Sequence, residues 1–246
     1  MKTTGNTILI TGGGSGIGRE LAQRFHALGN TVIVTGRRKA MLDETIGGRS
    51  AFFAYEVDID DPRAVAKFAR RVVVDHPELN VLINNAGILP FEDLRSADDL
   101  AKAEATVTTN VLGPIRLTYA LIEHLTTRPD AAIVNVSSGL AFVPLVSAPT
   151  YSATKAALHS LSVSWREQLA GRIEVIELAP PAVQTDLTPG QRTREGYLPL
   201  DDFMAEVMDL FQRVPTPAEI NVERVLFLRN AEADGRFPAT LAAVNS

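Results

Sequence analysis

Two polar residues, Tyr151 and Lys155, stand four positions apart in a segment from Tyr151 to about Ala170 whose pattern predicts a helix. At that spacing both side chains lie on one face of the helix. A free tyrosine has a pKa of about 10, too high for a good proton donor and acceptor at neutral pH, and a nearby ammonium lowers it. A hydroxyl such as that of Ser138 could hold a substrate oxygen and stabilise the charge that develops there. The set could therefore perform acid–base chemistry at a carbonyl or carbinol carbon, although a lone Tyr-x-x-x-Lys pair also occurs by chance on many helices.

A glycine-rich loop near the N-terminus accompanies this set. The stretch Thr11-Gly-Gly-Gly-Ser-Gly-Ile-Gly18 follows the strand-like Thr7–Thr11 and leads into a helical pattern over Gly16–Leu28. Glycines at such a junction allow a tight turn and bring phosphate close to the free N–H groups of the helix N-terminus. The loop therefore indicates a nucleotide cofactor, against the alternative of a strand–helix turn without a ligand. The residues expected along the cofactor here are Gly12, Gly14, Ser15, Gly16, Ile17 and Gly18.

The end of the second strand distinguishes between the two nicotinamide cofactors. An acidic residue about 20 positions past the loop would bind the ribose diol of NAD, but the chain has Arg37, Arg38 and Lys39 there. Arginine makes bidentate, charge-assisted hydrogen bonds to phosphate. Arg37 and Arg38 therefore predict the 2′-phosphate of NADP as their partner, although they could also form a solvated basic turn at a helix start.

Asp58, after the third strand, has two equally supported interpretations. Its carboxylate could accept a hydrogen bond from the adenine amino group, or it could belong to the N-cap region of a helix that begins at Asp60-Asp61-Pro62. Asp58 and its neighbour Ile59 are counted with the cofactor-binding residues.

Composition excludes several classes of protein. The chain has 246 residues, of which 46% are hydrophobic, as in a globular protein with a sizeable core. It has no cysteine, which excludes disulfides and thiolate metal sites, and we expect no metal. The formal net charge of −5 argues against nucleic acid or membrane partners. No apolar run has the length of a membrane span and the N-terminus does not resemble a signal peptide, so we expect a cytoplasmic protein.

Apolar runs of strand length alternate with helical patterns along the chain. This alternation predicts an α/β fold, a doubly wound, Rossmann-like parallel sheet of about six or seven strands with helices on both faces. We find no repeat or linker, so we expect residues 1–246 to form a single domain. Ligands of such sheets bind beyond the carboxyl ends of the strands, where the polar residues above lie. The predicted strands are Thr7–Thr11, Thr31–Thr35, Ala51–Val57, Val81–Asn84, Ala131–Val136 and Arg172–Leu178.

Taken together, these motifs resemble those of the short-chain dehydrogenase/reductase family, in its single-domain branch. Ser138, rather than Ser137, stands at the family's usual interval before Tyr151. The resemblance extends from the N-terminus to about Thr185. The matching elements are the glycine loop, Asn84-Asn-Ala-Gly87, Asn110, Ser137-Ser138 and Tyr151-Ser-Ala-Thr-Lys155.

The resemblance implies an oxidoreductase of the carbonyl reductase or alcohol dehydrogenase type, which transfers hydride between NADP(H) and a carbonyl or secondary alcohol. Tyr151 would be the general acid/base and Ser138 would polarise the carbonyl. Lys155 would bind the nicotinamide ribose and lower the tyrosine pKa. Asn110 would hold a water that connects the lysine to solvent.

The resemblance also assigns cofactor contacts and an assembly. Asn84, Ala86 and Gly87 would lie along the cofactor, and Asn85 would help to fix the central sheet. A homodimer or homotetramer is implied, and the helices around Ala103–Leu125 and Tyr151–Ala170 are the usual dimer surfaces of the family.

The chain departs from the family pattern in two places. Where the family usually has Pro-Gly, this chain has Pro180-Pro181, so the loop is stiffer. Pro181, the backbone N–H of Val183 and Thr185 are still expected at the nicotinamide carboxamide. The tail Phe237–Ser246 lacks the Gly-Gly pair near the family's last strand, and Pro217–Arg229 has the pattern of a late helix. These features are similar to a bacterial branch named after D-alanine esterification of teichoic acid.

The segment from Asp186 to about Gln212 corresponds to the family's substrate lid. Its amphipathic part, Leu200–Phe211, is equally consistent with a helix docked on the core. The residues expected around the substrate are nearly all apolar, which predicts an apolar ketone or aldehyde. The expected substrate-binding residues are Ser138, Leu140, Phe142, Val146, Tyr151 and Phe203, with Leu89, Phe91 and Pro144 as further wall candidates.

Other functions fit the sequence less well. A non-catalytic NADP-binding sensor or scaffold typically lacks the tyrosine or the lysine, and this chain has both. Epimerases and dehydratases usually need a longer C-terminal domain, and enoyl reductases space the tyrosine and lysine more widely. A mainly structural role through oligomer formation is permitted, but not required, by the apolar content of the helices.

Overall fold

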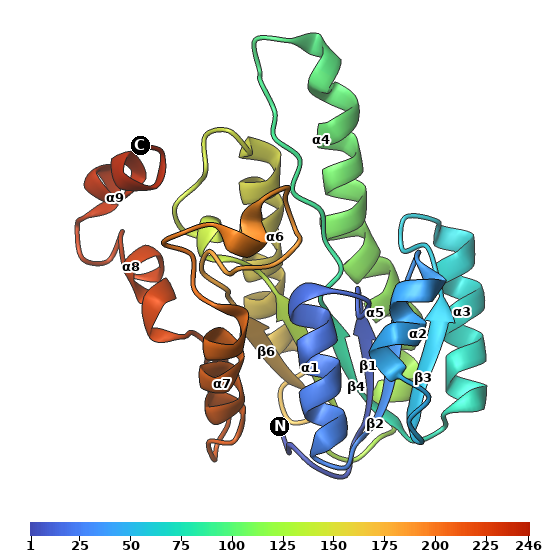
Figure 1. The fold of residues 1–246 in the computed structure, drawn as a ribbon. Helices are drawn as coiled ribbons and strands as arrows, with labels where there is room; N and C mark the ends of the chain where they lie inside the picture. Colours follow the sequence, from blue (N-terminus) through green and yellow to red (C-terminus); the bar gives the residue numbers. More distant parts are fainter.

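The computed structural model describes residues 1–246. A parallel sheet of seven strands in the order β3-β2-β1-β4-β5-β6-β7 runs through the molecule and confirms the predicted α/β doubly wound class (Figure 1). The chain order reverses between β1 and β4, and in such folds ligands bind beyond the carboxyl ends of the strands at this point. The strands are β1 Thr7–Thr11, β2 Thr31–Gly36, β3 Phe52–Glu56, β4 Leu79–Asn84, β5 Ala132–Val136, β6 Glu174–Leu178 and β7 Glu219–Ile220.

The strands at the centre of the sheet form because their sequences are apolar on both faces. Every residue of β1, β4 and β5 is buried, as expected for strands covered by helices on both sides. The six strands predicted from the sequence all occur, and their bounds differ by at most two residues. The largest differences are at β4, which begins at Leu79 instead of Val81, and at β6, which begins at Glu174 instead of Arg172.

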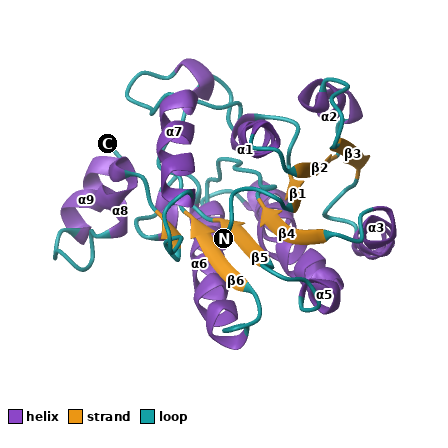
Figure 2. Ribbon diagram, turned by 90° about the horizontal axis from the view of Figure 1, so that it is seen from below, coloured by secondary structure: helices purple, strands orange, loops and turns teal.

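Helices cover both faces of the sheet (Figure 2). Helices α1, α2 and α7 lie on one face, and α3, α5 and α6 lie on the other. None of the helices is both long enough and apolar enough to cross a membrane. The helices are α1 Gly16–Ala27, α2 Lys39–Ile46, α3 Pro62–Asp75, α4 Leu100–Val107, α5 Gly113–Leu125, α6 Pro149–Gln168, α7 Leu200–Phe211, α8 Leu226–Arg229 and α9 Phe237–Val244.

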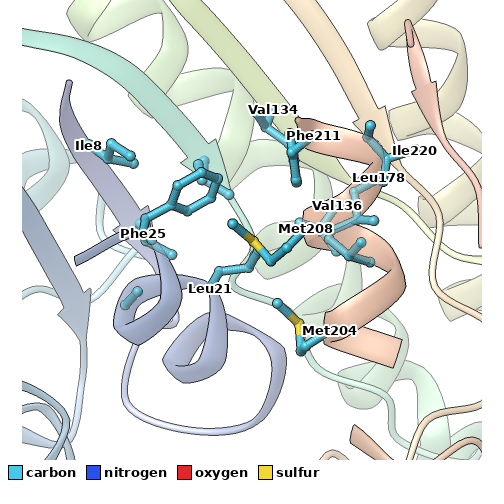
Figure 3. Close-up of a cluster of buried hydrophobic side chains, with 14 of the residues drawn as sticks. Ile8, Leu21, Phe25, Val134, Val136, Leu178, Met204, Met208, Phe211 and Ile220 are labelled. Carbon is cyan, nitrogen blue, oxygen red and sulfur yellow. The ribbon is translucent and has the colours of Figure 1, made fainter. Parts of the chain in front are cut away.

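Helix α7 is part of the hydrophobic core. Phe211 of α7 packs edge-on against Phe25 of α1, with 5.5 Å between the ring centroids, and Met204 and Met208 extend the same cluster (Figure 3). Phe203 is fully buried in it. The prediction that Phe203 binds substrate is therefore wrong. The apolar face of this helix packs against the core, which was the alternative open at the sequence level.

The C-terminal part of the chain corrects a second prediction. Pro217–Arg229 does not form one helix. Glu219–Ile220 pairs with β6 as the seventh strand, and a 3-10 turn at Glu223–Val225 leads into α8. The buried Ile220 and Val222 alternate with the period of a strand. A short seventh strand thus exists before the tail, and the tail itself forms the helix α9.

The helix predicted around Ala103–Leu125 is interrupted by a wide turn. A π-helical turn, Thr108–Leu112, separates α4 from α5. Pro114 has no N–H, so the carbonyl of Asn110 lacks the donor that an α-helix would supply. Single π-helical turns often occur at functional sites, and this one contains Asn110.

Candidate active site

A cleft of about 500 Å³ opens along the carboxyl ends of the strands. The glycine loop and Arg37 lie on its walls, together with Ser138, Tyr151 and Lys155. The fold thus brings together on one surface the motifs that the sequence places more than a hundred residues apart. The predicted cofactor residues that line it are Gly12, Gly14, Ser15, Gly16, Ile17, Gly18, Arg37, Arg38, Asp58, Ile59, Ala86, Gly87, Tyr151, Lys155, Pro181, Val183 and Thr185.

Tyr151 and Lys155 project from one face of α6, as their spacing predicts. The Lys155 Nζ lies 5.5 Å from the centroid of the Tyr151 ring and donates a hydrogen bond to the carbonyl of Val136 at 2.8 Å. Ser138 follows the end of β5 and lines the cleft with Tyr151, close enough for its hydroxyl to lower the pKa of the phenol. The three side chains can therefore act on the same substrate oxygen.

Burial dominates the acid–base properties of this set. It raises the pKa of Tyr151 to about 12, while the Ser138 hydroxyl acts in the opposite direction. It lowers the pKa of Lys155 to about 8, and the negative charge of Glu177 partly opposes that change. The expected lowering of the tyrosine pKa by the ammonium is not observed, because removal of the phenol from water raises that pKa.

Asn110 is fully buried, and its side chain is occupied by the protein. The amide accepts a hydrogen bond from the N–H of Ile88 and donates to the carbonyl of Ile88 and to Thr154 Oγ1, at 2.9 to 3.1 Å. A Cβ on Gly87 would lie 3.2 Å from Asn110 Oδ1 and 3.6 Å from Lys155 Nζ, so these two groups flank the same glycine. The side chain thus fixes the π-helical turn beside Lys155 and does not itself hold a water.

The glycine loop fits a dinucleotide phosphate. Gly12 and Gly16 have φ values of +68° and +52°, which side-chain-bearing residues rarely adopt. A Cβ on Gly18 would overlap the Asn85 amide and the Gly12 carbonyl. Ser15, the N-cap of α1, makes no side-chain cap hydrogen bond, which leaves the first N–H groups of the helix for a ligand.

Arg37 and Arg38 lie exposed on the cleft at the end of β2. The Arg37 guanidinium is 60% exposed and lies 3.9 Å from Asp60, so its charge is available to an anion. Asp58 is exposed beside them, and its Oδ1 accepts a hydrogen bond from the N–H of Asp60. The N-cap of α3 is Asp61, whose carboxylate accepts from the N–H of Arg63 at 2.8 Å. Asp58 is thus not the N-cap itself, but it caps the turn before α3 while it also lines the cleft, so the predicted cofactor contact stays a prediction.

Two consecutive asparagines, the last residue of β4 and the residue after it, have opposite orientations. Asn84 is 1% exposed and donates to Asn135 of β5 and Thr118 of α5, and it does not line the cleft. Asn85 does line the cleft, and its side chain donates to the carbonyl of Thr11 at 2.9 Å, joining β4 to β1. The cofactor contact predicted for Asn84 is therefore wrong. Asn85 lines the cleft instead and fixes the sheet as predicted, because successive residues along an extended chain face opposite sides and the motif does not show which is which.

Several expected substrate contacts lie outside the cleft. Leu140, Phe142 and Val146 are absent from its lining, and the ring of Phe142 instead packs against His159 at 5.0 Å. Phe91 and Pro144 are also absent, whereas Leu89 lines the cleft. The apolar residues that line the cleft include Ile88, Leu89, Pro90, Pro181 and Leu187.

Gln191 is a cleft residue that sequence reasoning did not identify. It is 8% exposed, and its amide donates to the carbonyl of Val183 and to Thr185 Oγ1 at 2.8 and 3.1 Å. These contacts tie the segment after Asp186 back to the Pro-Pro loop. The glutamine follows Gly190 in a polar stretch, and nothing in that pattern indicates burial.

Comparison with known proteins decides the family. The family model for short chain dehydrogenases matches residues 6–196. The chain belongs to the short-chain dehydrogenase family. Within it, the uncharacterized oxidoreductase DltE of Bacillus subtilis (strain 168) is 40% identical over 237 residues, which are 94% of this chain and 93% of DltE. This short-chain dehydrogenase is thus a member of a DltE-like subgroup.

Solved structures of the family have the same fold. A short chain dehydrogenase from Burkholderia cenocepacia J2315 in complex with NADP superimposes with a TM-score of 0.83 and 25% identity, and each chain is covered completely. A 3-ketoacyl-(acyl-carrier-protein) reductase from Brucella melitensis complexed with NADH gives a TM-score of 0.79 and 27% identity, covering 89% of this chain and 96% of that one. These likenesses support a dehydrogenase or reductase with a nicotinamide cofactor.

Proposed function

We propose that this short-chain dehydrogenase uses NADP(H) to interconvert a carbonyl compound and its alcohol, with an apolar ketone or aldehyde as the substrate. The observation that carries the proposal is the placement of Tyr151, Ser138 and Lys155 in the same cleft as the glycine loop. A bound nicotinamide would supply or accept the hydride. The residues of this chain would supply the remaining parts of the reaction, namely the proton and the stabilisation of the oxygen.

Tyr151 is the proton donor in carbonyl reduction. With its pKa raised to about 12 by burial, the phenol keeps its proton through the neutral range and remains more acidic than an aliphatic alcohol. The Ser138 hydroxyl holds the substrate oxygen as negative charge develops on it. Lys155 and the backbone carbonyl of Asn110, through a water between them, return a proton to the tyrosine.

The two arginines at the end of β2 support NADP over NAD. The solved relatives above bind NADP in one case and NADH in the other, so the fold alone does not decide the cofactor. Arg37 and Arg38 are exposed on the cleft wall. The end of β2 has no carboxylate in the position that binds the ribose diol of NAD. Two guanidinium groups there favour the 2′-phosphate.

The entrance to the cleft supports an apolar substrate and a small lid. Ile88, Leu89 and Leu187 are apolar residues of the cleft that also contains the catalytic set. Because α7 is fixed in the core, the lid is the segment that precedes it, from Asp186 to Tyr197. An exposed ion pair between Asp186 and Arg192 lies within this segment.

The proposal is tested by following oxidation of NADPH and of NADH with a panel of apolar ketones and aldehydes. We expect kcat/KM to be at least about tenfold higher with NADPH, since charge-assisted hydrogen bonds contribute about 1.5–3 kcal/mol each. The variants Arg37→Gln and Arg38→Gln should each lose about tenfold or more with NADPH and little with NADH. Lys39→Gln is the matched control, because Lys39 is paired with Asp43 on the next turn and does not line the cleft. Equal efficiency with the two cofactors would refute the NADP assignment.

A further inference from the structure

The buried side of α6 carries a polar stripe beside its apolar residues Leu158 and Trp165. Lys155, His159 and Ser162 recur at the spacing of one helix face, and each has a partner on the neighbouring strands. Lys155 Nζ bonds to the carbonyl of Val136, His159 Nδ1 to Glu177 at 2.7 Å, and Ser162 Oγ to Asn135 at 3.0 Å. A helix usually packs apolar residues at these positions. The polar stripe therefore has another role than core packing.

Glu177, on β6, is a fully buried carboxylate at the centre of this contact. One oxygen accepts a hydrogen bond from Ser137 Oγ, and the other faces His159 Nδ1. Because an ionised carboxylate only accepts hydrogen bonds, the imidazole carries its proton on Nδ1. The carboxylate thus links Ser137, next to Ser138, with His159, one turn after Lys155 on α6.

The charges around this carboxylate are few and identifiable. Tyr151, on the same helix, is one titratable group beside Lys155. Glu177 on β6 is the other, because Lys155 Nζ bonds to the carbonyl of Val136 while the carboxylate bonds to Ser137, the next residue, and to His159, one turn further along α6. Glu177 in turn faces His159 on α6 and the Arg229 guanidinium of α8. Glu219, the remaining carboxylate nearby, is neutralised by two hydrogen bonds from Arg229, at 2.7 and 3.0 Å.

The same groups do not form an open metal site. Ligand atoms of His159, Glu177 and Glu219 lie within 4.8 Å of one another. However, Arg229 already occupies Glu219, and Ser137 and His159 occupy both oxygens of Glu177. The cluster is a closed network of hydrogen bonds and ion pairs around one buried negative charge.

We propose that Glu177 is a positioning residue of the catalytic site, whose carboxylate is the fixed counter-charge of the buried Lys155 ammonium. It acts through Lys155 and through Ser137, and it touches neither substrate nor cofactor. The catalytic consequence rests on the proposed function, whereas the effect on the charge of Lys155 does not.

The direction of the effect follows from the balance at Lys155. Burial disfavours the ammonium, and Glu177 favours it, so that the pKa of Lys155 lies at about 8. Removing the carboxylate removes the favourable contribution alone. Lys155 should then lose its proton at a lower pH, within the range in which the enzyme works.

The charge of Lys155 can be measured directly by NMR. The chain has five lysines, so the ¹³Cε signals of a lysine-labelled sample are few, and Lys155→Arg assigns the signal of interest. In Glu177→Gln we expect the Lys155 titration midpoint to fall by about one pH unit, the lower end of the effect of one nearby charge. Glu219→Gln is the matched control and should leave the midpoint in place. An unchanged midpoint in Glu177→Gln would overturn the proposal.

A second variant separates charge from shape. Glu177→Asp keeps the charge but shortens the reach, and should give a midpoint between those of the wild type and Glu177→Gln. If Glu177→Gln does not fold, the Lys155 titration midpoint in Glu177→Asp provides the test by itself. An unchanged midpoint in that variant would refute the role of Glu177 as counter-charge.

The pH dependence of activity provides the catalytic test. The alkaline limb of kcat/KM for carbonyl reduction should move to lower pH in Glu177→Gln. A carboxylate with only a structural role would lower activity at every pH and leave the limb in place. If the wild type reduces no carbonyl compound, the proposed function fails, and the NMR titration still decides the role of Glu177.

Discussion

The chemistry of the candidate site depends on where single side chains are buried. Tyr151 and Lys155 are 6% and 4% exposed. Burial favours the neutral form of each group, so it raises the pKa of the tyrosine and lowers the pKa of the lysine. The phenol therefore remains a proton donor, and the ammonium becomes sensitive to its neighbours near neutral pH. Both properties suit a proton relay, and neither follows from the residue types alone.

Replacing the tyrosine tests its role most directly. We expect Tyr151→Phe to lower kcat/KM by about 10²- to 10⁴-fold, the contribution of a positioned general acid. Cofactor binding should be retained, as measured by the enhancement of NADPH fluorescence. Tyr119→Phe, which changes a tyrosine 70% exposed on α5, should leave activity unchanged. Activity of Tyr151→Phe near the wild-type level would contradict the assignment.

The lysine should reduce the stability of the fold that contains it. A pKa lowered from 10.5 to about 8 corresponds to a cost of about 3 kcal/mol for burying the charged group. We expect Lys155→Met to abolish activity and to raise the free energy of unfolding by up to about 3 kcal/mol in urea denaturation at pH 7. A less stable variant would show that the hydrogen bond to Val136 and the pairing with Glu177 outweigh the cost.

The pH dependence of that difference has a definite sign. Below pH 8 the lysine is charged in both the folded and the unfolded chain, so the cost is fully present. Between about pH 8 and 10.5 the unfolded chain binds the extra proton, so wild-type stability rises with pH because of this residue. The advantage of Lys155→Met should therefore shrink over this interval.

Among the elements, the turn between β1 and α1 has the strictest steric requirements. A Cβ on Gly18 would overlap the backbone of Gly12 and the side chain of Asn85, which itself joins β1 to β4. Neither neighbour can move without disturbing the sheet. The glycine pattern thus reflects packing of the loop as well as access for phosphate.

Gly18→Ala tests this packing. We expect a lower free energy of unfolding and at least about tenfold weaker NADPH binding, because overpacking costs about 1–3 kcal/mol. Gly36→Ala is the control, since its Cβ would meet only Leu42 at 3.6 Å and its φ is not positive. Thermal unfolding and a fluorescence titration measure both effects. Equal behaviour of the two variants would show that the loop can relax.

On the scale of the whole molecule, α4 to α6 carry exposed apolar side chains. Tyr119 of α5 and Val163 of α6 are 70% and 43% exposed, and Val107 at the end of α4 is 40% exposed. Isolated apolar residues on a surface need no explanation, but a group on helices of one face suggests an interface. We propose that this face joins two copies of the chain, as the family resemblance implies.

Light scattering tests the assembly. We expect a mass of about twice the 26.6 kDa of one chain. Tyr119→Glu combined with Val163→Glu should shift the protein toward the monomer. Val74→Glu, at a residue 78% exposed on α3, should not. A monomeric wild type would exclude this interface, and a tetramer would require a second one.

The sequence by itself determined the fold class, the family and the chemistry available at the site. Strand and helix periods, the glycine loop and the Tyr151–Lys155 spacing are local patterns, and local geometry follows from them directly. Even so, the late helix was placed wrongly, because Ile220 and Val222 satisfy a strand as well as a helix within so few residues.

Only the tertiary structure decided which side chains face the cleft. It turned Asn85 rather than Asn84 toward the cleft, placed Phe203 in the core and set Glu177 behind Lys155. These outcomes depend on contacts between elements far apart in the chain and on the direction of each side chain in its element. A one-dimensional pattern specifies which residues are apolar or charged, but not which of them will share a buried space.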